Sequence, residues 1–156
     1  MENNTQCAIP CFSSPHFDRL IFYTDNKLER NYLVWMMFKK GISRKKIATF
    51  LGYNHSSVIS HAVLNLQAIG DDEDIIEYFR LGLDFVDIFH DHELDPDKYV
   101  LILLNYMYRF GIRTKDDVKN LPEDQLNEFL STYHMKRIGP RARDIFVEYW
   151  DQLRKN

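Results

Sequence analysis

The sequence predicts an all-α protein, and three observations carry that prediction. Apolar residues recur every three or four positions, which is the spacing of one helix face. Glycines and prolines stand between these apolar runs, where helices begin and end. No stretch alternates apolar and polar residues around a hairpin dipeptide. With 156 residues, 45% of them hydrophobic and 14% aromatic, the chain can form one ordinary domain or two small ones.

Three helices are expected in the first half of the chain, each followed by a glycine. They cover residues 27–40, 43–51 and 56–68, and Ser43 is the expected N-cap of the second. Their glycines are at positions 41, 52 and 70. The side chains expected to face inward are Ile47, Phe50 and Leu51 in the second helix and Val58, Ala62, Leu66 and Ile69 in the third.

The second half is expected to continue with helices. A solvated amphipathic helix is expected to start at Asp71 and to carry an apolar stripe. A straight helix and a helix kinked near Gly82 are both consistent with the sequence. The dipeptide Asp95-Pro96 opens a helix over 97–110, because proline fits the first helical turn, and Gly111 ends it. The remaining expected elements are a short turn from Thr114 to Asn120, a helix from Pro122 to about Tyr133, and a last helix from Gly139-Pro140 to near Arg154.

Charge is distributed unevenly along the chain. The formal net charge is -3, but segment 26–68 carries +6 and segment 71–98 carries -9, while 1–25 and 99–156 carry -2 and +2. A basic patch inside an acidic protein is typical of proteins that bind polyanions. On charge alone, a solvated helix face is the favoured interpretation.

Residues 47–62 read Ile-Ala-Thr-Phe-Leu-Gly-Tyr-Asn-His-Ser-Ser-Val-Ile-Ser-His-Ala. This order predicts a helix, a tight glycine turn and a second helix, which is the architecture of a helix-turn-helix. The residues that begin the second helix, His55, Ser56 and Ser57, are polar groups able to reach base edges in the major groove.

This segment resembles the DNA-binding domain of the bacterial replication initiator DnaA, whose second helix has the pattern Asp-His-Thr-Thr-Val-x-x-Ala. The resemblance covers residues 27–69 and departs at Asn54, at Tyr53 and in a turn about one residue shorter. It implies base contacts from the start of the second helix and phosphate contacts around the first. The expected base-contacting residues are Asn54, His55, Ser56, Ser57 and Ser60, and the expected phosphate-contacting residues are Lys39, Lys40, Ser43, Arg44, Lys45, Lys46 and His61. His61 is equally consistent with a packing role.

A shorter stretch near the C-terminus resembles the helix-hairpin-helix-like C-terminal domain of the bacterial RNA polymerase alpha subunit. The pattern is carried by Ile138, Gly139, Arg141 and Ala142, and Pro140 departs from it. A glycine turn that enters a helix can bind phosphate through backbone N–H groups. The candidate second phosphate site therefore comprises Lys136, Arg137, Gly139, Arg141 and Arg143. A helical hairpin that packs, binds a protein partner or self-associates is the alternative.

Several classes of protein are disfavoured. The longest apolar run, from Tyr99 to Tyr108, is far shorter than the roughly 20 residues that cross a bilayer, and MENNTQ does not resemble a secretory signal, so we expect a cytoplasmic protein without membrane contact. Cys7 and Cys11 are expected to be free thiols, and with His16 they supply too few donors for zinc. No catalytic cluster or GxxxxGK[ST] loop occurs, so we expect neither enzymatic activity nor a cofactor.

The expected organisation is an N-terminal arm (1–25), a DnaA-type helix-turn-helix bundle (26–70), an acidic connecting helix (71–94) and a small helical, helix-hairpin-helix-like lobe (95–156). The expected function is sequence-specific binding of double-stranded DNA in transcriptional or replication control. The alternative is a protein-interaction adaptor that uses the helix-turn-helix only as a scaffold.

Overall fold

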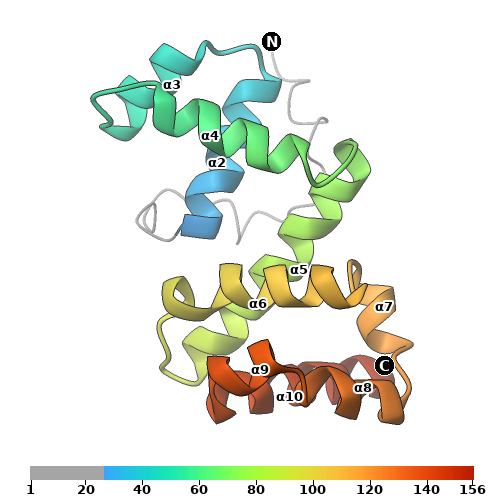
Figure 1. The fold of residues 1–156 in the computed structure, drawn as a ribbon. Coiled ribbons are helices and arrows are strands. Elements are labelled where there is room, and N and C mark those ends of the chain that lie inside the picture. Colours follow the sequence, from blue (N-terminus) through green and yellow to red (C-terminus); the bar gives the residue numbers. More distant parts are fainter. Residues whose placement is uncertain (1–26) are drawn as a thin grey trace. The chain divides into compact units, whose positions relative to one another are not determined.

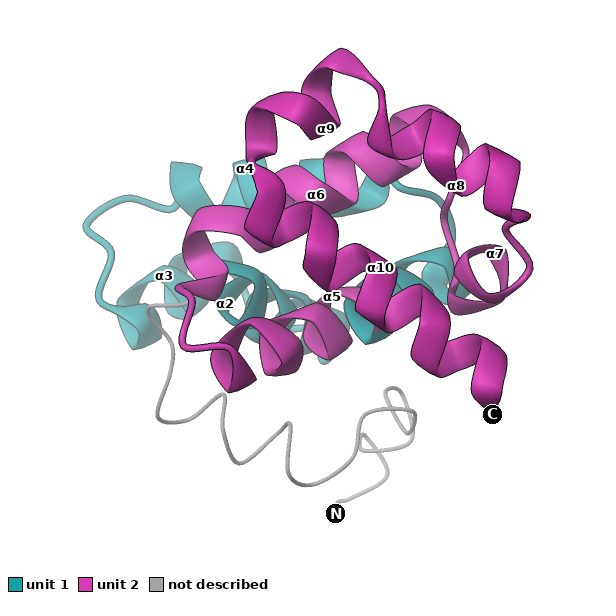
Figure 2. Ribbon diagram, turned by 90° about the horizontal axis from the view of Figure 1, so that it is seen from below, with its two compact units in different colours: residues 1–80 teal, residues 81–156 magenta. Residues whose placement is uncertain are grey.

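A computed structural model describes residues 27–156, and within that range every regular element is an α-helix (Figure 1). The predicted all-α class is confirmed. The chain divides into two compact units, residues 1–80 (unit 1) and 81–156 (unit 2), which Figure 2 distinguishes by colour. The division falls inside one helix. Segment 71–94, which was expected to be an acidic connecting helix, therefore lies across this division.

Unit 1 contains α2 (Lys27–Lys39), α3 (Arg44–Leu51), α4 (Ser57–Gln67) and the start of α5. The predicted ends of α3 are confirmed. The Ser43 hydroxyl accepts the Lys46 backbone N–H at 3.2 Å, and Gly52 closes the helix with φ 83° and ψ 20°. Both ends are fixed by local hydrogen bonds and backbone sterics, which a sequence encodes directly.

One core cluster of unit 1 joins α2, α3 and α4. It is made by Val34, Ile47, Ala48, Ile59 and Val63, all buried. Partly buried side chains surround this cluster, namely Met37, Phe38, Ile42, Leu51, Tyr53 and Ala62. Three helices that share one cluster hold each other at fixed angles.

The expected inward faces of α3 and α4 are partly wrong. Phe50 is 69% exposed and Val58 is 41% exposed, whereas Ile59, Val63 and Leu66 are buried. On a helix with 3.6 residues per turn, Phe50 and Val58 each lie about 100° from the stripe that faces the core. Both helices carry two adjacent apolar stripes, so periodicity alone could not select the one that packs against α2.

Helix α5 (Asp72–Asp91) continues through Gly82, and it is not a solvated helix. In unit 1 the ring of Phe79 packs 5.2 Å from that of Tyr32 and 6.0 Å from that of Trp35. In unit 2 its buried residues are Leu81, Leu83, Phe85, Val86 and Phe89. The exposed acidic residues lie at or next to its ends (Asp71, Asp72, Glu73, Asp74 and Asp91), whereas Glu77, Asp84 and Asp87 in its middle are partly buried.

Unit 2 contains α6 (Pro96–Phe110), α7 (Lys115–Lys119), α8 (Glu123–Leu130), α9 (Tyr133–Ile138) and α10 (Pro140–Lys155). The helix starts predicted at Asp95-Pro96 and Thr114 are confirmed, and Thr114 forms a capping box with Asp117. The helix expected to run from Pro122 to Tyr133 instead ends at Leu130. The Thr132 hydroxyl accepts the Met135 N–H at 3.4 Å and so starts a separate helix, α9.

Replacing Gly52 with alanine is expected to lower the free energy of unfolding by about 1–2 kcal/mol, because an L-residue is strained in the left-handed conformation. A Cβ at Gly52 would meet no atom within 4 Å, so the loss reflects backbone strain and not a clash. Urea denaturation measures the change. Gly52→Asn is the matched control and should lose less, since asparagine tolerates this conformation better; an alanine variant as stable as the wild type would contradict the turn geometry.

Candidate nucleic-acid interface

The turn between α3 and α4 is tight and anchored. The Gly52 N–H donates to the Thr49 carbonyl at 3.2 Å, and the Tyr53 N–H donates to the Ala48 carbonyl at 2.8 Å. Arg30 of α2 donates from Nη1 to the Tyr53 hydroxyl at 2.8 Å, and its guanidinium carbon lies 5.8 Å from the ring centroid. These contacts fix the direction in which the chain enters α4.

Four of the five expected base-contacting residues stand free at the start of α4. Asn54, His55, Ser56 and Ser57 are exposed, and none of their side chains has a hydrogen-bond partner within residues 27–156. Ser56 is the N-cap residue, but its side chain makes no capping bond. Ser60 is partly buried. The start of α4 thus presents exposed polar side chains that make no hydrogen bond within residues 27–156.

The expected phosphate-contacting lysines differ in their surroundings. Lys40, Lys45 and Lys46 are exposed, and no acidic side chain pairs with them in the part of the chain that the structure describes. Lys39 instead forms an ion pair with the Asp72 Oδ2 atom at 3.0 Å. Three unpaired lysines at the end of α2 and the start of α3 therefore maintain a local positive potential.

The other three expected phosphate-contacting residues have distinct roles. Ser43 uses its hydroxyl oxygen as the acceptor of the α3 cap, so its hydroxyl hydrogen remains available to an external acceptor. The Arg44 guanidinium carbon lies 5.3 Å from the Phe38 ring centroid. His61 is exposed on α4.

An exposed stripe on α4 lies opposite the core. Ser57, His61 and Leu64 follow each other at i, i+4 and i+7, and the Leu64 side chain is 58% exposed. Leu64 did not appear among the expected contact residues. Its position follows from helical spacing only once Ile59, Val63 and Leu66 are known to face inward.

The candidate second phosphate site is less uniform. Lys136 and Arg141 are exposed, but Arg141 lines an open pocket of about 350 Å³ together with the carboxylates of Asp144 and Glu148, which compete with a phosphate. Arg143 is partly buried and its Nε atom has no hydrogen-bond partner. The Gly139 turn leads directly into Pro140, which has no N–H to offer.

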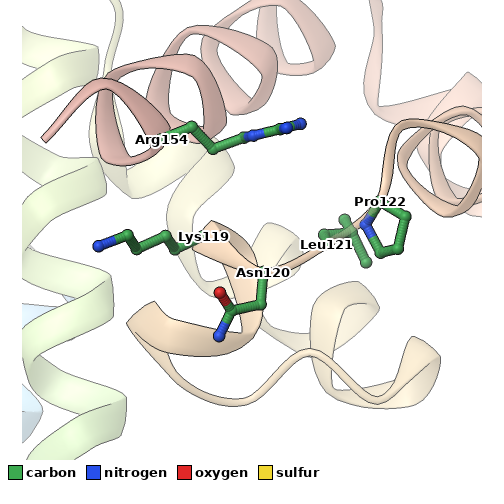
Figure 3. A pocket seen from close by; sticks show the side chains of 5 residues that line it. All are labelled: Lys119, Asn120, Leu121, Pro122 and Arg154. Atoms are coloured by element: carbon green, nitrogen blue, oxygen red, sulfur yellow. The ribbon is translucent and has the colours of Figure 1, made fainter.

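A second open pocket of unit 2, about 340 Å³, is lined by Lys119, Asn120, Leu121, Pro122 and Arg154. Figure 3 shows the side chains of Lys119 and Arg154 extending in opposite directions, so they do not converge on one ligand. The Arg154 guanidinium carbon instead lies 4.4 Å from the Trp150 ring centroid. This pocket provides no arrangement of groups that suggests catalysis.

Residues 27–156 contain no group of three or more side chains placed to hold a metal ion. Cys7, Cys11 and His16, which were considered as metal ligands, lie outside the described residues. None of the helices in the described range is long and apolar enough to span a bilayer.

Comparison of the chain with protein-family models, with curated proteins and with solved structures found no match.

Proposed function

We propose that unit 1 is a helix-turn-helix that binds double-stranded DNA sequence-specifically in transcriptional or replication control. The observation that carries the proposal is the start of α4. There Asn54, His55, Ser56 and Ser57 are exposed, and their side chains make no hydrogen bond within residues 27–156. The core beneath them holds α4 against α2 and α3. An α-helix held in this way can enter the major groove, where such side chains read base edges.

The lysines around α3 support the same proposal. Lys40, Lys45 and Lys46 have no acidic partner among the described residues, so binding phosphate requires no existing ion pair to break. Contacts of this kind position a protein on the duplex without reading its sequence. They also release counterions, which makes affinity depend on salt concentration.

The test begins with selection of sites from a random duplex library by the full-length protein. Affinity for the enriched site is then measured by fluorescence anisotropy for the wild type and the triple variant His55→Ala, Ser56→Ala, Ser57→Ala. We expect a loss of tenfold or more on the enriched site, since each good base contact is worth about 1–3 kcal/mol. Affinity for unrelated duplex should change little.

Lys45→Gln is the matched control, because it removes a phosphate contact and leaves the reading residues intact. It should weaken binding to all sequences alike and reduce the slope of log affinity against log salt by about one. Equal effects of the triple variant on site and non-site DNA would contradict sequence reading.

One observation favours the alternative function, a protein-interaction adaptor. Phe50, Val58 and Leu64 of unit 1 are large apolar side chains exposed to solvent. Where such side chains form a contiguous patch, they mark a protein interface. If the library yields no enriched site and weak binding disappears near physiological salt, the adaptor function is favoured and Phe50→Ser becomes the variant to test for loss of a protein partner.

A further inference from the structure

Charges in unit 2 are segregated along the chain. No acidic residue occurs in 98–115 or in 129–143. These segments contain α9 and all of α6 after its first two residues, and the two helices pack against each other. Their basic residues are Lys98, Arg109, Arg113, Lys115, Lys136, Arg137, Arg141 and Arg143, whereas the acidic residues of unit 2 all lie in 81–97, 116–128 and 144–156. Apart from Asp97 in the first turn of α6, the packed helices α6 and α9 therefore carry only positive charge, within a unit that has more acidic than basic residues.

Aromatic rings lie among these cations. The His134 ring stacks on the Tyr106 ring at a centroid distance of 4.7 Å and an interplanar angle of 22°, and its Nε2 atom is 3.2 Å from Arg109 Nη1. The Tyr133 ring meets His134 edge-on at 5.7 Å. We call the set Tyr106, Arg109, Tyr133, His134, Lys136 and Arg137 the α6–α9 surface.

Tyr133 is the outermost ring of the α6–α9 surface. It is 66% exposed, although burying a tyrosine ring in the core would be favourable. Arg137 Nη1 donates to its hydroxyl at 3.1 Å, with the guanidinium carbon 5.5 Å from the ring centroid. Arg137 therefore restricts the orientation of an exposed aromatic ring and places a cation over it.

A basic surface with exposed aromatic rings is the chemistry of single-strand binding, in which bases stack on the rings and cations contact the phosphates. A duplex keeps its bases stacked inside and offers no free base face to Tyr133. We propose that the α6–α9 surface binds single-stranded nucleic acid, with a base stacked on Tyr133 and phosphates held by Arg109, Lys136 and Arg137. This site shares no residue with the proposed helix-turn-helix and does not depend on it.

The test uses fluorescence anisotropy with full-length protein, a labelled single strand of about 16 thymidine nucleotides, and a duplex of the same length. To reduce the contribution of unit 1, all proteins carry His55→Ala, Ser56→Ala, Ser57→Ala, Lys40→Gln, Lys45→Gln and Lys46→Gln. In this background we expect the single strand to bind more tightly than the duplex. Tyr133→Ala should weaken single-strand binding about tenfold, as expected for loss of one stacked base, while Tyr133→Phe should retain most of it.

Lys136→Glu gives a second variant that does not alter the ring, and it should also weaken single-strand binding about tenfold or more at low salt. The matched control is Arg154→Gln, because Arg154 also lies over an aromatic ring but about 20 Å further along α10 than Pro140. It should leave affinity within about twofold of the background protein. Unchanged binding in Tyr133→Ala, an equal loss in Arg154→Gln, or tighter binding of the duplex would overturn the proposal.

Discussion

Replacing Ile59 with alanine is expected to lower the free energy of unfolding of unit 1 by about 2–4 kcal/mol. Ile59 is fully buried in the cluster that joins α2, α3 and α4. Removing most of its side chain leaves a cavity among Val34, Ile47 and Val63, and these neighbours close such a space only in part. The result would place Ile59 at the centre of the structure that supports α4.

Val58→Ala is the matched control, one residue earlier on the same helix. Val58 is half-exposed, so its truncation is expected to change the free energy of unfolding by less than about 1 kcal/mol. Comparing Ile59→Ala with Val58→Ala therefore tests whether the stripe of α4 that contains Ile59 or the stripe that contains Val58 faces the core.

Tryptophan fluorescence during urea denaturation measures both changes. Trp35 is buried in unit 1, and a Trp150→Phe background removes the tryptophan of unit 2, so the signal reports on unit 1 alone. A greater loss in Val58→Ala than in Ile59→Ala would contradict the packing described for α4.

Replacing Phe85 with alanine is expected to lower the free energy of unfolding of unit 2 by about 3–5 kcal/mol. Phe85 is fully buried in the second half of α5. Its ring lies 4.7 Å from that of Tyr149 and 6.2 Å from that of Phe146, both on α10. The variant therefore tests whether the acidic helix forms part of the core of unit 2.

Amide hydrogen exchange, resolved by peptide, measures the effect of Phe85→Ala. Exchange in α6 and α10 should accelerate about 100-fold or more where it occurs through opening of the whole unit. Asp91→Ala, at the exposed end of α5, is the control and should leave this exchange nearly unchanged. Equal protection in Phe85→Ala and the wild type would indicate that α5 is not required for the fold of unit 2.

The elements of the candidate interface could be predicted where local chemistry fixes them. Ser43 and Gly52 delimit α3, and Asp95-Pro96 and Gly111 delimit α6, because caps and left-handed turns act over four or five residues. The polar groups at the start of α4 were expected from the order helix, glycine turn, helix, and not from capping, because the Ser56 side chain makes no capping bond. The start of α9 at Thr132 was missed, because a threonine is compatible with both a cap and a helix interior.

The sequence by itself determined that this protein is helical, where most helices begin and end, and that a basic segment precedes an acidic one. Only the tertiary structure decided that Ile59 and not Val58 faces the core, that α5 is buried in both units, and that Tyr133 meets Tyr106 and Arg109 through His134. The physical reason is the distance along the chain over which each interaction acts. Caps depend on neighbours along the chain, whereas the choice between two apolar stripes depends on the shape of a partner helix encoded elsewhere.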